Sequence, residues 1–293
     1  MKGPRIGFLL PHYNQPSNSH MPVVMRTLAE WGATADVIHP SDRAIDVSTV
    51  RVEHDLYVLK NTGGLAMSLA GALHAQGAFI VNPYPVTAAL QDRVIVGRIL
   101  QAAGVPTPAT YVASRPDRLA PLLEAGPLVV KPYRGTGGSG VYVVRSAAEL
   151  AAAVPAGKDP LFAQRYHAPE GRDLKMYLIG DKVFGVEKVF PRRTEEEKHG
   201  KPFTPSPELR QIVLRCARAF GIDLCGVDII ESEGQPYVVD ISSMPGFKGV
   251  PDAPLHLASY LYQAAERAAR ARPLRQESDR LPDPALANPG GNL

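Results

Sequence analysis

The first 92 residues alternate short apolar runs with amphipathic stretches. Apolar runs at residues 5–10, 35–40, 55–60 and 78–83 have the length and composition of β-strands. Residues 21–32 and 65–77 instead repeat apolar positions at helical spacing, with Val24, Leu28 and Trp31 on one face, and each stretch ends at a glycine. Strands that are apolar almost throughout, alternating with helices, predict a parallel sheet covered by helices, an α/β fold.

From residue 92 onward the pattern changes to pairs of strands. Residues 128–145, 173–190 and 224–242 each predict two strands joined by a glycine-containing turn. Helices are predicted at residues 92–104, 147–154, 207–221 and 255–271. We therefore expect α+β structure in the C-terminal half, with domains at residues 1–92, 93–160 and 161–272. Residues 273–293 contain few apolar residues and much Pro, Asp, Asn and Gly, so we expect a disordered tail.

Charge and cysteine content narrow the class of protein. The 293 residues include 32 basic and 29 acidic side chains, a net charge of +3, which gives no reason to expect a nucleic-acid partner. Two cysteines cannot form a disulfide framework or a four-cysteine zinc site, and we expect both to pack in the core. No apolar run has the length of a membrane span or of a signal peptide, so we expect a cytoplasmic protein with no membrane partner.

The hairpin at residues 128–145 carries a glycine-rich turn. Glycines allow backbone amides to approach a phosphate closely. The four glycines of this turn are Gly135, Gly137, Gly138 and Gly140. Lys131 and Arg134 add positive charge just ahead of them, which favours a phosphate site over a hairpin tip without a ligand. A strand rather than a helix follows, and this excludes a Walker A loop and a dinucleotide-binding fingerprint.

The hairpin at residues 224–242 places two aspartates in apolar strands. Asp228 and Asp240 lie twelve residues apart across a short turn, so the hairpin can bring both carboxylates to one face. Ser242 follows on the same face. Two carboxylates combined with substrate phosphates are the usual ligands of Mg²⁺. The alternative is that the aspartates cap turns or pair with arginines.

Two polar loops follow predicted strands of the N-terminal sheet. Ligands of such sheets bind at the carboxyl ends of the strands. We expect Lys60 to be the best anchor for a carboxylate or phosphate. The full set of candidate substrate-binding residues is His12, Tyr13, Asn14, Lys60, Asn61, Lys188 and Lys248.

In this order the motifs resemble the ATP-grasp superfamily between residues 81 and 272. The motifs are NPYPVTAALQDR, AGVPTP, VVKPYRGTGGSGV, FAQRYH, GRDLKMYLIGD, GVDII and VVDISSMPGFKG. The chain is most similar to RimK-type glutamate ligases and to ATP-grasp inositol polyphosphate kinases. The resemblance implies an ATP-grasp fold behind an N-terminal parallel-sheet domain, with ATP and Mg²⁺ as cofactors.

The resemblance also implies a role for individual residues. Phosphate contacts fall to Arg93, Lys131 and a mobile flap that contains Arg134, Gly135, Gly137, Gly138, Ser139 and Gly140. The adenine is read by Gln164 and by the backbone of Arg165 and Tyr166, and the ribose is bound by Asp173. Lys175 faces the transferred phosphate, and Lys175 and Lys131 are the catalytic candidates. The metal ligands are Asp228, Asp240 and Ser242.

Three positions depart from the family pattern. Arg93, Arg165 and Ser242 stand where the family usually has Lys, Glu and Asn. Because a hydroxyl is a poorer metal ligand than an amide carbonyl, Ser242 puts a second Mg²⁺ in doubt. Arginine can still contact phosphate, so we expect Arg93 to keep its role.

Three functions remain open at this point. A carboxylate–amine ligase would form an amide through an acyl phosphate on an amino-acid or peptide-like substrate. A kinase would phosphorylate a hydroxyl of an inositol phosphate or similar polyol, and a regulatory domain would bind ATP without turnover. The acidic run at residues 195–197 would repel a polyanion, which favours the ligase, although we expect this segment to be a solvated loop. Many relatives are dimers or tetramers, so a homodimer is one option.

Overall fold

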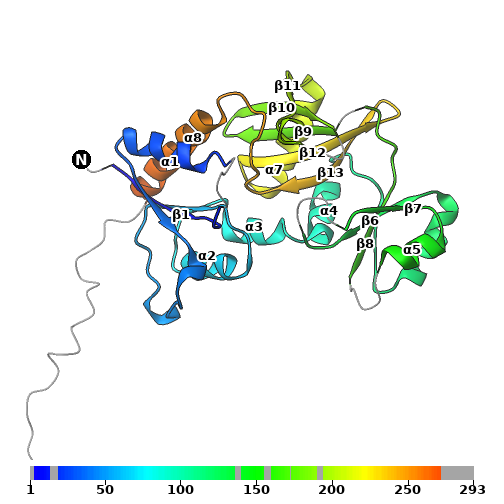
Figure 1. Cartoon of the computed structure of the whole chain (residues 1–293), viewed down its shortest axis with the longest axis horizontal. Helices are drawn as coiled ribbons and strands as arrows, with labels where there is room; N and C mark the ends of the chain where they lie inside the picture. The colour runs from blue at the N-terminus through cyan, green and yellow to red at the C-terminus, as the bar shows by residue number, and fades with distance from the viewer. Residues whose placement is uncertain are drawn as a thin grey trace, which may run out of the picture.

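The computed structural model describes residues 3–13, 19–135, 140–154, 160–171, 173–189 and 194–271. Three sheets follow one another along the chain, a parallel sheet and two antiparallel sheets (Figure 1). The predicted C-terminal tail lies outside the described residues. No helix within the described ranges is long and apolar enough to cross a membrane.

The N-terminal sheet has four parallel strands in the order β2-β1-β3-β4. Its strands are β1 (Arg5–Leu9), β2 (Thr34–Ile38), β3 (Leu56–Leu59) and β4 (Ile80–Val81). Its helices are α1 (Met21–Glu30) and α2 (Gly64–Ala75), with single 3-10 turns at Pro40–Asp42 and Val47–Thr49. Every residue of β3 is buried, as expected for a central strand of a parallel sheet.

Two helices and a small antiparallel sheet come next. The helices are α3 (Tyr84–Ala89) and α4 (Arg93–Ala102). The sheet, in the order β5-β8-β6-β7, consists of β5 (Thr110–Ala113), β6 (Leu128–Pro132), β7 (Tyr142–Val144) and β8 (Leu161–Arg165). Helix α5 (Ala147–Ala153) and 3-10 turns at Pro116–Arg118 and Ala120–Ala125 complete this unit, which has its own core.

The third sheet has five antiparallel strands in the order β11-β10-β9-β12-β13. The strands are β9 (Asp173–Ile179), β10 (Lys182–Lys188), β11 (Lys201–Phe203), β12 (Leu224–Ser232) and β13 (Gln235–Ser242). The helices are α6 (Glu195–His199), α7 (Pro207–Phe220) and α8 (Ala253–Ala271). The predicted hairpins at residues 173–190 and 224–242 are confirmed by the pairing of β9 with β10 and of β12 with β13.

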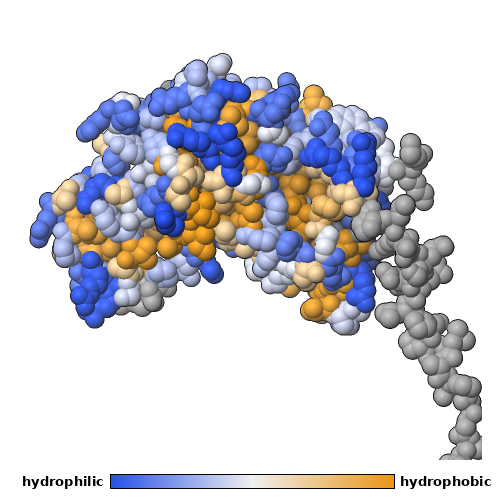
Figure 2. All heavy atoms as spheres, turned by 180° about the vertical axis from the view of Figure 1, so that it is seen from behind, coloured by the Kyte–Doolittle hydropathy of each residue, from blue (hydrophilic) through white to orange (hydrophobic). Residues whose placement is uncertain are grey.

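Helices at the domain boundaries join the units into continuous cores. Helix α8 returns to the N-terminal unit and packs beside α1, so their side chains share one core with β1, β3 and β9 (Figure 1). Helix α4 likewise packs its buried Val96 and Leu100 with α7 and the five-stranded sheet. Seen from behind, the lower side of the molecule is hollowed between the N-terminal unit and the small sheet (Figure 2). Both cysteines are buried, as expected.

Two sequence expectations are wrong. Trp31 is the C-cap residue of α1 and is 40% exposed, because its ring lies at the edge of the core, in T-shaped contact with Tyr262 of α8. The acidic run at residues 195–197, expected to lie in a solvated loop, belongs to α6, and β11 follows it. Thr194 and Glu197 make a reciprocal capping box that starts α6, and β11 pairs with the edge of β10.

Candidate active site

Three charged residues form a row across the five-stranded sheet. Lys175 on β9 lies opposite Asp228 on β12, and Asp228 lies opposite Asp240 on β13. Directly opposed residues project from the same face of a sheet, so the two carboxylates share a face as the hairpin pattern predicts. The ammonium of Lys175 forms an ion pair with Oδ1 of Asp228. The alternative of Asp–cation pairing is therefore also present in the structure.

A β-bulge next to this row gives Lys131 its partner. Asp228 opposes Asp240, but the next residue of β12 opposes Val238, so Val239 is left out of the pairing. The carbonyl of Val239 accepts a hydrogen bond from Nζ of Lys131 at 3.1 Å. Lys131 belongs to the small sheet, so this bond spans the two antiparallel sheets.

The pKa of Lys131 is lowered to about 8, mainly by burial, with a smaller lowering by the charge of Arg93 and a partial offset by the charges of Asp240 and Asp228. Desolvation disfavours the charged form of a lysine, and nearby carboxylates favour it. Its ammonium also donates to Oε1 of Gln164 at 2.8 Å. Lys131 is thus a half-buried cation within the field of both aspartates, and phosphate binding by it stays a prediction.

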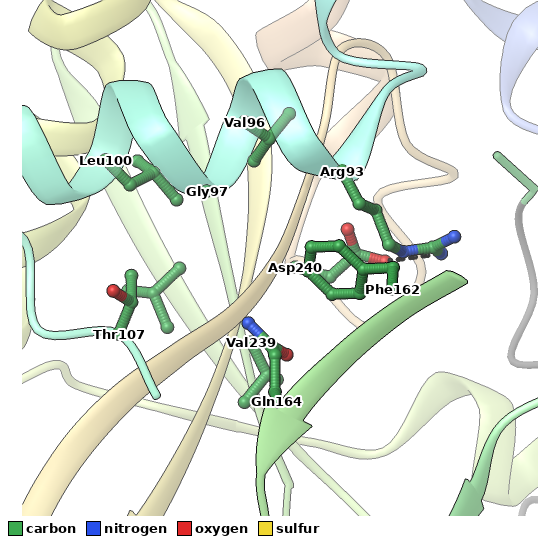
Figure 3. Close-up of a pocket in the computed structure, with 10 residues that line it drawn as sticks. Arg93, Val96, Gly97, Leu100, Thr107, Phe162, Gln164, Val239 and Asp240 are labelled. Atoms are coloured by element: carbon green, nitrogen blue, oxygen red, sulfur yellow. Dashed lines mark hydrogen bonds and ion pairs between the residues drawn. The ribbon is translucent and has the colours of Figure 1, made fainter. Parts of the chain in front are cut away.

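Arg93 connects the glycine-rich turn to Asp240. It is the first residue of α4, whose N-terminus is capped by the carboxylate of Asp92. Its guanidinium donates to the carbonyls of Pro132 at 2.5 Å and Gly135 at 2.9 Å, and lies 3.3 Å from Oδ2 of Asp240. Figure 3 shows Arg93 and Asp240 pointing toward each other at one end of a pocket between α4, β8 and β13.

The predicted adenine-binding residues make contacts within the protein. Gln164 is 6% exposed, and its Nε2 donates to Oγ1 of Thr110, so its side chain orients Lys131. The N–H groups of Arg165 and Tyr166 donate to the carbonyls of Ala109 and Pro127. The guanidinium of Arg165 binds carbonyls of the turn at residues 122–127, which gives this departure from the family pattern a structural role. Adenine binding by this segment stays a prediction.

The remaining residues predicted to bind the nucleotide or the metal lie on β9, on β13 and around the glycine-rich turn. Asp173 lies two residues before Lys175 and shares its face of β9. Ser242 lies two residues after Asp240, opposite Gly226, and its hydroxyl donates to the carbonyl of Gly226 at 3.3 Å. Arg134 is exposed and stacks on the ring of Tyr133, 5.3 Å from its centroid. Gly135 and Gly140 flank the turn, whereas Gly137, Gly138 and Ser139 lie outside the described residues.

Two predicted substrate lysines already have partners in the protein. Nζ of Lys60 donates to the carbonyls of Met244 at 2.6 Å and Pro245 at 2.8 Å, which ties β3 to the loop after β13. Lys188 is 6% exposed, and its ammonium donates to the carbonyl of Lys198 and the hydroxyl of Tyr177. Lys188 therefore holds the end of α6.

Of the other predicted substrate residues, Lys248 lies in the loop after β13, where its carbonyl accepts a hydrogen bond from the hydroxyl of Tyr177, and the rest come from the loops after β1 and β3. The ring of His12 contacts Asp42 at 2.5 Å and stacks on His39. Asn61 accepts a hydrogen bond from the backbone of Gly63 at 3.0 Å. Tyr13 packs against the core that contains Phe247, and Asn14 lies outside the described residues.

Sequence reasoning missed Asn82, a fully buried residue that follows β4. Its Nδ2 donates to the carbonyls of Leu224 and Ser243 and to the hydroxyl of Ser243. Asn82 thereby joins the N-terminal unit to both strands of the hairpin that carries the aspartates. A polar residue that ends an apolar strand was the available signal, but its partners lie more than 140 residues away.

Lys131 of the small antiparallel sheet reaches β13, the strand of the five-stranded sheet that carries Asp240, and a parallel sheet precedes both in the chain. This arrangement is that of an ATP-grasp protein. The family model for the RimK-like ATP-grasp domain matches residues 90–263, and the chain belongs to this family. A probable alpha-L-glutamate ligase of Shewanella loihica is 28% identical over 208 residues, covering 66% of this chain and 69% of the relative. A probable alpha-L-glutamate ligase of Marinobacter nauticus is 30% identical over 190 residues, or 60% and 63% of the two chains.

Solved structures confirm the predicted fold class. A RimK-domain ATP-grasp protein of Sphaerobacter thermophilus superimposes with a TM-score of 0.71 at 20% identity, covering 89% of this chain and 99% of that one. The D-alanine–D-alanine ligase of Bacillus anthracis, complexed with ATP, superimposes with a TM-score of 0.68 at 19% identity, covering 92% and 98%. At these identities the likeness concerns the fold.

Proposed function

We propose that the protein is an ADP-forming carboxylate–amine ligase that uses ATP and Mg²⁺. The observation that carries the proposal is the row of Lys175, Asp228 and Asp240, with Lys131 and Arg93 converging on it from the small-sheet side. The alpha-L-glutamate ligases among the relatives favour amide formation on an amino-acid or peptide-like substrate.

The donor atoms suit Mg²⁺ that is shared with phosphates. Asp228 and Asp240 present hard carboxylate oxygens on one face, and the hydroxyl of Ser242 lies beside them. No cluster of three or more acidic, histidine or cysteine ligands occurs among the described residues, so phosphate oxygens would have to complete the coordination. The bound metal would neutralise charge that develops on the transferred phosphoryl group.

The residues of the cleft support a two-step reaction. An oxygen of the substrate carboxylate attacks the γ-phosphorus of ATP, the bond to the β-phosphate oxygen breaks, and ADP leaves with that electron pair. Lys131 and Arg93 bind the phosphates, and Lys175 faces the transferred group. An amine then attacks the acyl phosphate, inorganic phosphate leaves, and the nitrogen loses a proton as the amide forms.

Product analysis tests the proposal. A ligase releases ADP and inorganic phosphate in amounts equal to the amide, and added hydroxylamine traps the acyl phosphate as a hydroxamate. Formation of ADP and a phosphoester without free phosphate would instead identify a kinase, and absence of turnover with every donor would identify a regulatory domain. Asp228→Asn and Asp240→Asn should abolish turnover, whereas Asp181→Asn, in the exposed turn between β9 and β10, should leave it unchanged.

A further inference from the structure

Four basic side chains from separate segments gather around the loop that follows β13. His20 is the N-cap residue of α1, Lys60 follows β3, His199 ends α6, and Lys248 belongs to the loop. Burial lowers the pKa of His20, a bond to the backbone of Phe247 raises it, and the charges of His199, Lys248 and Lys60 lower it further. The lowered pKa leaves the ring of His20 neutral at pH 7, within electrostatic reach of His199, Lys248 and Lys60.

Backbone contacts hold this basic cluster, His20, Lys60, His199 and Lys248, in place. The two carbonyl bonds of Lys60 attach the end of β3 to residues 244–245. The carbonyl of His199 lies against Gly249, where a Cβ would approach it to 2.0 Å, so only glycine permits the contact. The cluster is therefore assembled by the fold itself.

His20 has an unmet hydrogen-bonding group. Its Nε2 is buried and has no hydrogen-bond partner among the described residues, and its side chain does not cap α1. No carboxylate is among the described groups whose charge acts on its ring. Buried polar atoms are ordinarily hydrogen-bonded, and a neutral ring whose other nitrogen bonds the backbone of Phe247 can gain a proton on Nε2 when a negative charge lies beside it. Protonated Nε2 would donate to an anion that the neighbouring lysines attract, so both features indicate a negatively charged ligand.

The basic cluster lies near the row of metal-ligand candidates. Met244, which Lys60 binds, is four residues beyond Asp240, and four extended residues span at most about 14 Å. His20 and Lys60 follow β1 and β3, the two central strands of the parallel sheet, at its carboxyl edge. One short segment, residues 240–248, therefore joins the carboxylate row to the basic cluster, and a substrate that contacts both would lie along it.

We propose that the basic cluster binds a carboxylate or phosphate that the substrate carries in addition to the carboxylate that is activated. The inference rests on the proposed ligase function and narrows its substrates to compounds with two anionic ends. His20 and Lys248 contact the second anion, and Lys60 positions the loop and adds its charge.

Donor substrates of matched shape test this directly. Glutarate, 4-phosphonobutanoate and glutaramate each offer one carboxylate, with a second carboxylate, a phosphonate or a neutral amide at the other end. With hydroxylamine as the amine, the parent enzyme should have a KM at least about tenfold lower for one of the dianions than for glutaramate, as expected for a charge-assisted hydrogen bond. The preferred dianion distinguishes a carboxylate from a phosphate site.

Variants show whether the preference arises at the cluster. His20→Gln and Lys248→Met should each reduce the preference about tenfold while the KM for ATP stays within about twofold. His74→Gln and Lys182→Met change exposed residues of α2 and β10 and serve as matched controls. An unchanged ratio of KM values in both cluster variants would overturn the inference, even where the ligase reaction itself proceeds.

Binding without turnover separates the two proposals. Inorganic phosphate and glutarate are titrated into the protein while the ring signals of its histidines are followed by NMR, with the His20 signal identified by its loss in His20→Gln. A saturable shift that weakens in Lys248→Met supports the cluster, even if no hydroxamate forms and the ligase proposal fails. Absence of a saturable shift of His20 with both anions refutes the cluster.

Discussion

Asn82 offers the sharpest test of how the N-terminal unit supports the carboxylate hairpin. Its side chain is 1% exposed, and its Nδ2 lies 2.7 Å from the carbonyl oxygen of Leu224 and 2.9 Å from that of Ser243. Leu224 begins β12 and Ser243 directly follows β13. A single amide group therefore fixes the open end of the hairpin whose strands present Asp228 and Asp240.

The substitution Asn82→Asp keeps the shape of the side chain and removes its donor. An acidic oxygen then replaces a donor in front of two carbonyl oxygens. Each buried polar group left without a partner costs about 1–3 kcal/mol, so two carbonyls predict a loss of about 2–6 kcal/mol in the free energy of unfolding. Since natural domains have only about 5–15 kcal/mol in total, this loss should be easy to detect.

The loss should also depend on pH. Burial raises the pKa of a carboxyl above its unfolded value of about 4, so the folded protein must bury a charge or take up a proton at neutral pH. Below the unfolded pKa this penalty vanishes, and the protonated acid can donate one hydrogen bond. The destabilisation is therefore largest at neutral pH and decreases as the pH falls toward 5.

Urea unfolding of the parent and of Asn82→Asp at pH 5 and pH 8 measures both effects. Hydrogen exchange of β12 and β13 shows whether the loss is located in the hairpin. Asn61→Asp is the control, because the side chain of Asn61 accepts a hydrogen bond from Gly63, and a carboxylate keeps that role. A loss below about 1 kcal/mol, or one equal at both pH values, would refute the assigned bonds.

Three further substitutions test separate parts of the site. Lys131→Met should raise the Kd of ATP at least about tenfold, and in the parent the affinity should fall as the pH rises above about 8, where the buried ammonium loses its proton; calorimetry at pH 7 and pH 9 checks both. Lys175→Met should lower kcat about 100-fold with little change in the Kd of ATP, measured by ADP release and calorimetry. Lys188→Met should cost about 2 kcal/mol of stability and increase hydrogen exchange in α6, since the carbonyl of Lys198 loses its donor.

The elements that sequence predicts well are those with local signals. Helix α7 begins after Ser206, whose side chain accepts from the N–H of Leu209, and ends at Gly221 in the left-handed region. Each contact lies within a few residues, so spacing and residue type suffice. Helix α6 shows the limit of the charge pattern, because its Thr194–Glu197 capping box was present in the sequence beside an acidic run that suggested a loop.

The same distinction between local and long-range signals applies to the candidate active site. Asp228 and Asp240 could be recognised because charged residues interrupt apolar strands of a single hairpin. The hydrogen bond from Lys131 to the bulge at Val239 could not be recognised, since the two residues lie more than 100 positions apart. The same holds for Lys188, which nothing in the sequence distinguishes from an ordinary surface lysine. Its ammonium is enclosed by Tyr177 and the end of α6.

Arg93 shows what the departure from lysine at this position does in the structure. Its guanidinium contacts the carbonyls of Pro132 and Gly135 and the carboxylate of Asp240 at once. A planar group with five donors can serve three acceptors in fixed directions, whereas an ammonium on a flexible stem cannot. Arg93 therefore ties the end of β6, the start of the glycine-rich turn and the strand that carries Asp240 together through one side chain.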